Sequence, residues 1–319
     1  MPVVRGVSDW LIRDARLASL ENLILKIQPI ILAGGLRDVP LERALGVPLL
    51  GLPIRPQNLV VELWADVLAS SSNVEFPIKV VTSSKEKANQ LLPIISDERF
   101  RLITDPFPHR GTAGVLADIR ATIPEMNLGI DYYLVLDQSS CPPKSLVAML
   151  AKLSEGDDIV IGVSRFDRLA GILAFKPGVL DLVPGVGYQD FKEQTLAKAR
   201  EAGLRIAAHQ AMSEAIRIDH IGGVLDAVKY WAESNPEGER DTKSFFEGEC
   251  SIHDSVRGSG AIVVDSICME GSVIGDGAVV ARSIIGPNVT IPKGAKIIDS
   301  VVDSSVSFNT KQLANWRGA

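Results

Sequence analysis

The chain has 319 residues, a formal net charge of −6 and 46% hydrophobic residues, values that allow a sizeable core and argue against a disordered chain. It contains no sustained run of Lys or Arg, so nucleic acid is not expected as a partner. No stretch approaches the roughly 20 apolar residues that span a bilayer, and no signal-peptide pattern opens the chain. We therefore expect a soluble, cytoplasmic protein with no membrane partner.

The first part of the chain combines a helical pattern with a short apolar run. Apolar residues recur at spacings of three and four between Ser8 and Lys26, which predicts a helical arm over residues 1–27. A continuous apolar run from Ile30 to Ala33 follows and is closed by Gly34-Gly35. Such a run is typical of a strand that is buried on both faces of a parallel sheet.

Helical and strand patterns then alternate through a predicted domain that covers residues 28–235. Helical spacing covers 59–70, 85–92, 112–123 and 146–153, and strand patterns cover 76–82, 101–104, 132–136 and 158–163. This alternation predicts βαβ units and an α/β fold with a three-layer, mostly parallel sheet. Ligands bind at the carboxyl ends of the strands in such sheets, where the Gly34-Gly35 turn and Asp137 are expected.

The pattern changes after residue 235. A polar stretch with Pro and Gly predicts a linker over 236–250. In the predicted C-terminal domain, residues 251–319, small aliphatic residues recur about every six positions, as in Ser272-Val-Ile-Gly-Asp-Gly277. Such hexapeptide repeats predict a short parallel β-helix, although a small antiparallel sheet is an alternative. The flat sides and exposed end of a β-helix favour a homo-oligomer.

Several motifs occur in an order that resembles one enzyme family. They are Leu32-Ala-Gly-Gly35, Pro48-Leu-Leu-Gly-Leu-Pro53, Gly111-Thr-Ala-Gly114, the strand-terminal Asp137 and the repeat tail. Together they resemble the sugar-1-phosphate nucleotidyltransferases, many of which carry a left-handed β-helix of hexapeptide repeats. The resemblance implies that a sugar 1-phosphate attacks the α-phosphate of a nucleoside triphosphate, usually with Mg²⁺, giving an NDP-sugar and pyrophosphate.

The resemblance implies a phosphate loop that departs from the family pattern. The family's loop continues through Gly-Thr-Arg and later reaches Pro-Lys, whereas here only Arg37 offers a loop cation, Asp38 adds a negative charge, and no lysine lies near Val47. Arg37 is therefore the candidate catalytic cation. A glycine turn that serves folding alone is the alternative. The nucleotide-binding residues implied for this loop are Leu32, Ala33, Gly34 and Gly35.

Two carboxylates match the family's metal-binding positions. Asp137 ends a predicted strand and is implied as a catalytic residue and Mg²⁺ ligand, and Asp219 is implied as the second Mg²⁺ ligand. Mg²⁺ commonly uses one or two carboxylates together with substrate phosphates. Alternatively, Asp137 caps a helix and Asp219 is a surface carboxylate. The adjacent His220 is interpreted as structural.

Two further segments resemble the substrate-binding parts of the family. Gly111 and Thr112 are implied in binding the nucleotide base, although Thr112 could equally be an ordinary helix cap. Lys192 is the candidate ligand of the sugar phosphate and Glu193 of the sugar hydroxyls, although both could belong to an exposed helix start.

Three functions follow from these residues. The first is a nucleotidyltransferase that acts on a nucleoside triphosphate and a sugar 1-phosphate. The second is a non-catalytic regulatory or assembly relative that binds nucleotide or sugar phosphate without turnover, which the missing loop lysine and Asp38 favour. The third is a structural module that oligomerises through its β-helix.

Overall fold

The computed structural model describes residues 25–34, 39–56, 58–71, 73–107, 109–232, 251–252 and 255–305. Almost all of the predicted arm, residues 1–27, therefore lies outside the described residues. So do the predicted linker, the second glycine of the loop (Gly35) and the candidate cation Arg37. None of the described helices is both long and apolar enough to cross a membrane.

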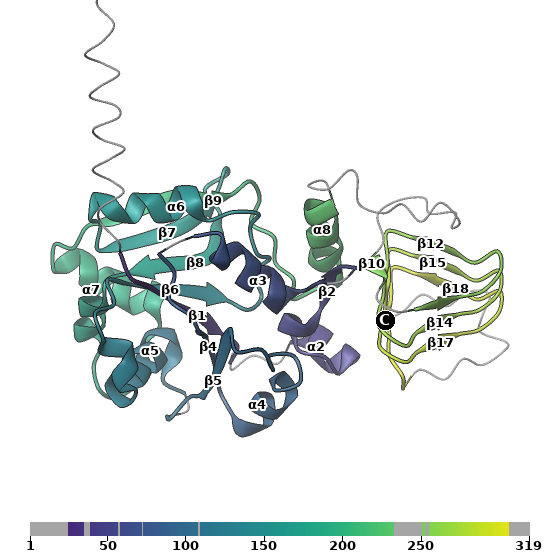
Figure 1. Cartoon of the computed structure of the whole chain (residues 1–319), viewed down its shortest axis with the longest axis horizontal. Helices are drawn as coiled ribbons and strands as arrows, with labels where there is room; N and C mark the ends of the chain where they lie inside the picture. Colours follow the sequence, from purple (N-terminus) through teal and green to yellow (C-terminus); the bar gives the residue numbers. More distant parts are fainter. Residues whose placement is uncertain are drawn as a thin grey trace, which may run out of the picture.

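The larger part of the molecule is built on a mixed sheet. Within the described residues its strands are β1 Ile27–Leu32, β4 Ile78–Thr82, β5 Phe100–Thr104, β6 Tyr132–Asp137, β7 Ile159–Ser164, β8 Leu169–Phe175 and β9 Ile206–Met212. Their order is β5-β4-β1-β6-β8-β7-β9 (Figure 1). β8 runs antiparallel to both of its neighbours, and the other pairs are parallel. The α/β class with a parallel-rich sheet is confirmed, whereas β8 and β9 were not anticipated.

Helices cover both faces of this sheet because alternate strand residues point to opposite sides. The helices are α2 Pro40–Leu45, α3 Val60–Ala69, α4 Lys85–Leu91, α5 Gly111–Thr122, α6 Val147–Lys152, α7 Leu196–Glu201 and α8 Ile221–Ala232. Leu134 and Leu136 of β6 join the hydrophobic core that contains α3, α6 and α8. Tyr133 and Val135 join a second core with α5 and α7.

The C-terminal part consists of short parallel strands. They are β10 Ser251–Ile252, β11 Val256–Arg257, β12 Ile262–Val264, β13 Ile267–Cys268, β14 Val273–Ile274, β15 Val279–Ala281, β16 Ile284–Ile285, β17 Thr290–Ile291, β18 Lys296–Ile298 and β19 Val301–Val302. They form the sheets β10-β13-β16-β19, β11-β14-β17 and β12-β15-β18. Parallel pairing excludes the antiparallel alternative and fits a hexapeptide β-helix, whose left-handed sense stays a prediction.

Buried serines connect successive coils of the C-terminal part. The Ser283 N–H donates to Ser266 Oγ at 3.1 Å, and the Ser300 N–H donates to Ser283 Oγ at 3.2 Å, each across 17 residues. The residue before Ser283, Arg282, has a left-handed φ of 48°, which turns the chain at this corner. The serine hydroxyls therefore satisfy backbone donors at a corner where the strand ladder is interrupted.

The β-helix packs against the element that follows the predicted phosphate loop. α2 contacts β19, and the strand β2 (Pro53–Arg55), which pairs with β3 (Asn58–Leu59), contacts β10. Leu45 of α2 and Ile284 of β16 belong to the same hydrophobic core. The two parts of the chain thus share buried apolar surface.

Candidate functional site

The predicted phosphate loop begins at the carboxyl end of the central strands. Leu32 of β1 pairs in register with Asp137 of β6, so these two residues lie side by side. The buried Ala33 donates its N–H to the carbonyl oxygen of Val81 at 2.7 Å. A Cβ atom at Gly34 would lie 2.3 Å from the backbone nitrogen of Ser83, so only glycine fits there. Gly34 therefore has a role in folding, whether or not the loop binds phosphate.

The two candidate metal ligands come together around a third residue. Arg217 Nη1 donates to Asp137 Oδ2 at 2.9 Å, and Arg217 Nη2 donates to Asp219 Oδ2 at 2.9 Å. One guanidinium thus bridges carboxylates that come from distant segments of the chain. Arg217 was not among the predicted site residues, although the alternation Ile216-Arg-Ile-Asp219 places Arg217 and Asp219 on one side of an extended segment.

Backbone contacts hold Arg217 in this position. Ser140 and Arg217 form an isolated antiparallel bridge, and the buried Ile218 donates its N–H to the carbonyl oxygen of Ser139 at 2.8 Å. A Cβ atom at Gly223 would lie 1.6 Å from the carbonyl oxygen of Arg217, so α8 can approach Arg217 only through a glycine. His220 accepts the Gly223 N–H at Nδ1, 3.0 Å away, a contact that agrees with a structural role.

The charges at this cluster are mutually stabilised. Partial burial lowers the pKa of Arg217, but the carboxylates of Asp137 and Asp219 outweigh it and raise that pKa above its usual value. The guanidinium is therefore a permanent cation. Asp137 is oriented further by Ser139, whose N–H and hydroxyl donate to Asp137 Oδ1 at 3.0 and 2.6 Å.

The described residues do not form a site that is ready for Mg²⁺. Mg²⁺ requires near-octahedral oxygen ligands with free lone pairs. Both oxygens of Asp137 accept hydrogen bonds, and Asp219 Oδ2 accepts one from the same guanidinium. Each Oδ2 keeps a second lone pair, but the positive guanidinium lies against both carboxylates and repels a divalent cation, so displacement of Arg217 would favour Mg²⁺ binding.

The implied base-binding residues are engaged by a neighbouring segment. Gly111 has a φ of 75°, and a Cβ atom there would lie 2.5 Å from the carbonyl oxygen of Gln189. That carbonyl oxygen accepts the N–H groups of Ala113 and Gly114 at the start of α5. Thr112 Oγ1 donates to Asp190 Oδ2 at 3.1 Å and accepts a backbone N–H at 2.9 Å. These polar groups therefore join α5 to the segment around residue 190.

The candidate sugar-phosphate residues lie on this same segment. Lys192 and Glu193 are exposed at the start of the π-helix Phe191–Thr195, and Asp190 Oδ1 accepts both of their N–H groups at 2.8 and 3.0 Å. The contact between Thr112 and Asp190 brings the predicted base and sugar-phosphate segments together. Asp137 and Asp219 form a separate cluster with Arg217.

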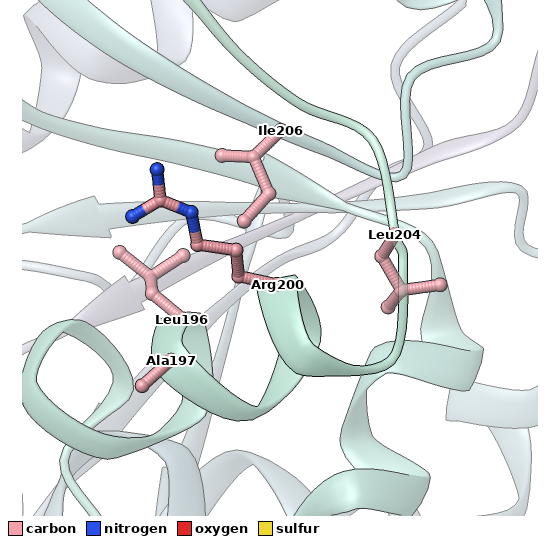
Figure 2. Close-up of a pocket in the computed structure, with 5 residues that line it drawn as sticks. All are labelled: Leu196, Ala197, Arg200, Leu204 and Ile206. Atoms are coloured by element: carbon pink, nitrogen blue, oxygen red, sulfur yellow. The ribbon is translucent and has the colours of Figure 1, made fainter.

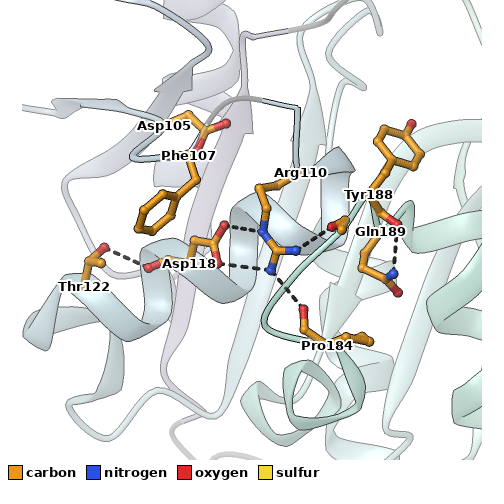
Figure 3. Close-up of polar contacts among 9 residues, drawn as sticks. Asp105, Phe107, Arg110, Asp118, Thr122, Pro184, Tyr188 and Gln189 are labelled. Atoms are coloured by element: carbon orange, nitrogen blue, oxygen red, sulfur yellow. Dashed lines mark hydrogen bonds and ion pairs between the residues drawn. The ribbon is translucent and has the colours of Figure 1, made fainter.

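A buried ion pair fixes the contact between these segments. Arg110 donates to Asp118 at 2.8 and 3.3 Å and to the carbonyl oxygens of Pro184, at 2.9 Å, and Gly187 (Figure 3). The side chains of Arg110 and Asp118 are only 9% and 12% exposed. Arg110 therefore ties the residue 184–190 segment to α5, a role that the sequence analysis did not assign.

Two further features lie at the amino end of the parallel strands. A depression of about 440 Å³ is lined by Leu196, Ala197, Arg200, Leu204 and Ile206, the last of these at the start of β9 (Figure 2). The second feature lies next to the start of β7, where ligand atoms of Glu155, Asp157 and His209 lie within 4.8 Å of one another. Glu155 is already paired with Lys152 at 2.6 Å. Neither feature adjoins the Asp137 cluster at the opposite end of the sheet.

The comparisons with known proteins concern the C-terminal part. Residues 239–313 match the family described as GlmU-like, C-terminal hexapeptide. None of the curated proteins matches this chain closely enough to count as a relative. The parallel strands β10 to β19 lie within the matched range and provide its structural counterpart. The C-terminal part of this chain is therefore a hexapeptide-repeat domain similar to the GlmU-like C-terminal domain.

Proposed function

We propose that this chain is a non-catalytic relative of the sugar-1-phosphate nucleotidyltransferases, which binds a nucleotide or a sugar phosphate at the carboxyl end of β1 and β6 without transferring a nucleotidyl group. The parallel-rich sheet and the hexapeptide-repeat domain support the relationship. The observation that supports the absence of turnover is the position of the Arg217 guanidinium, which bridges Asp137 and Asp219.

The charge balance explains why this bridge disfavours transfer. Two carboxylates with Mg²⁺ are neutral overall, whereas two carboxylates with Arg217 carry a net charge of about −1. A triphosphate would meet this negative charge without the metal that normally neutralises its phosphates. Loss of such neutralisation typically costs several kcal/mol of transition-state stabilisation, which is a rate loss of orders of magnitude.

One observation favours the alternative, in which the chain transfers NMP from an NTP to a sugar 1-phosphate. Asp137 and Asp219 do converge at the edge of the sheet where such a reaction would take place. This function requires Arg217 to leave the carboxylates, so that they could hold Mg²⁺. A metal held there would supply neutralisation of the phosphate charge, and Arg37 would keep the role of loop cation that the family resemblance implies.

The experiment is a pyrophosphate-release assay with each NTP, a panel of sugar 1-phosphates and Mg²⁺. We expect no turnover above that of Asp137→Ala, together with a rise in melting temperature on addition of a nucleotide or sugar phosphate in EDTA. Pyrophosphate release that Asp137→Ala abolishes would instead establish the transferase. If neither release nor stabilisation occurs, the chain acts as a structural module.

Self-association stays a prediction, and the exposed Val256 and Ile262 are available for contact with a second copy.

A further inference from the structure

We infer that Arg217 is an internal cation that occupies the place of a divalent metal, and that removing its guanidinium would convert Asp137 and Asp219 into a metal site. This inference deepens the proposed function, on which it rests: it assigns the loss of the metal site to one residue.

The geometry shows that the two carboxylates face one position. Both contacts are made by terminal nitrogens of one guanidinium, at 2.9 Å to Asp137 Oδ2 and 2.9 Å to Asp219 Oδ2. The two oxygens are therefore both within hydrogen-bond reach of one cationic group. A hard divalent ion such as Mg²⁺ or Mn²⁺ binds paired carboxylate oxygens of this kind.

The carboxylates are held in place by more than the guanidinium. Asp137 ends β6 and accepts two hydrogen bonds from Ser139, so its Oδ2 stays directed toward the cluster. A Cβ atom at Gly171 would lie 3.1 Å from Asp137 Cβ, which shows that the backbone of β8 confines the same side chain. Asp219 follows Ile218, whose backbone is bonded to Ser139. The backbone that carries each carboxylate is therefore fixed independently of the guanidinium, and Ser139 also holds the Asp137 side chain.

Electrostatics then favour a metal ion. The cluster of Arg217, Asp137 and Asp219 has a net charge of about −1, and without the guanidinium it has about −2. Two uncompensated carboxylates at one position repel each other, and a divalent cation removes this repulsion. In the native chain the ion would first have to displace a guanidinium that both carboxylates hold.

The test measures Mn²⁺ binding in two ways. The electron paramagnetic resonance signal reports the concentration of free Mn²⁺, and the melting temperature reports stabilisation of the protein by the bound ion. We expect Arg217→Met to lower the half-saturating Mn²⁺ concentration at least tenfold relative to the native chain, and Asp137→Asn in the same background to abolish the gain. The matched control is Arg165→Met. Arg165 pairs with one exposed carboxylate, that of Glu214, at 3.2 Å, whereas Arg217 pairs with two. This control should bind Mn²⁺ as the native chain does.

Two results would overturn the inference. In one, the native chain binds Mn²⁺ as tightly as Arg217→Met does, and Asp137→Asn in the native chain abolishes this binding. The metal would then displace Arg217 without any substitution. The other is a folded Arg217→Met that gains no Mn²⁺ affinity. If Arg217→Met does not fold, Arg217→Gln replaces it, since glutamine keeps hydrogen-bond donors and lacks the positive charge. A folded glutamine variant without any gain refutes the inference equally. Failure of ligand stabilisation in EDTA would refute the proposed function instead, so the two failures are distinguishable.

Discussion

Replacement of Arg110 by methionine should destabilise the α/β part of the chain strongly. The substitution leaves the carboxylate of Asp118, only 12% exposed, without its cation. It also removes the donors to the carbonyl oxygens of Pro184 and Gly187. Breaking a buried ion pair from one side typically costs 3–5 kcal/mol. Because the pair retains slight solvent access, we take the lower end, about 3 kcal/mol.

Urea unfolding followed by far-ultraviolet circular dichroism measures this loss. With a slope of roughly 2–3 kcal/mol per molar urea, a loss of about 3 kcal/mol lowers the unfolding midpoint by about 1–1.5 M. The matched control is Arg101→Met, because the pair of Arg101 with Glu125 is 3.5 Å long and about half exposed. Such a pair contributes at most about 1 kcal/mol. Equal midpoints for the two variants would refute the assignment of Arg110 as the residue that joins α5 to the 184–190 segment.

Two more predictions use the same assay. Gly223→Ala should cost about 2 kcal/mol or more, because its Cβ atom would lie 1.6 Å from the Arg217 carbonyl oxygen, whereas at Gly222 the nearest atom is 3.5 Å away. Gly222→Ala should be neutral or stabilising, and similar losses in both variants would contradict this account. Burial raises the pKa of Tyr132 to about 12, so the folded chain retains the phenol proton that the unfolded chain loses near pH 10. Stability should therefore fall by up to about 1.4 kcal/mol per pH unit between pH 10 and 12. Tyr132→Phe should lack this contribution, and an identical pH slope in that variant would disprove it.

The amino-acid sequence predicted much of the fold because its signals are local. The apolar runs and helical spacing between residues 59 and 163 gave the strands β4 to β7 and the helices α3 to α6 to within about two residues. The hexapeptide period in the last part of the chain gave a parallel β-helix in the same way. β8 was missed because its sequence, Leu169–Phe175, contains the tightly packed Gly171 and its antiparallel insertion depends on both neighbouring strands.

The candidate site could be predicted only in part. The sequence identified Asp137 by its place at a strand end and Asp219 through the family resemblance, and the structure brings both to one cluster. Arg217 is one of 33 Lys and Arg residues, and nothing local in the sequence showed which carboxylates it would meet. Its partner Asp137 lies 80 residues away.

The sequence by itself therefore determined the order of the elements, the repeat domain and the two carboxylates. Periodicity and strand ends are properties of a short stretch of chain, so they can be read without knowledge of distant neighbours. The tertiary structure alone decided what stands between the carboxylates. The backbone bridge from Ser140 to Arg217 and the close approach at Gly223 bring a guanidinium to that position. A contact of this kind depends on how separate segments pack together.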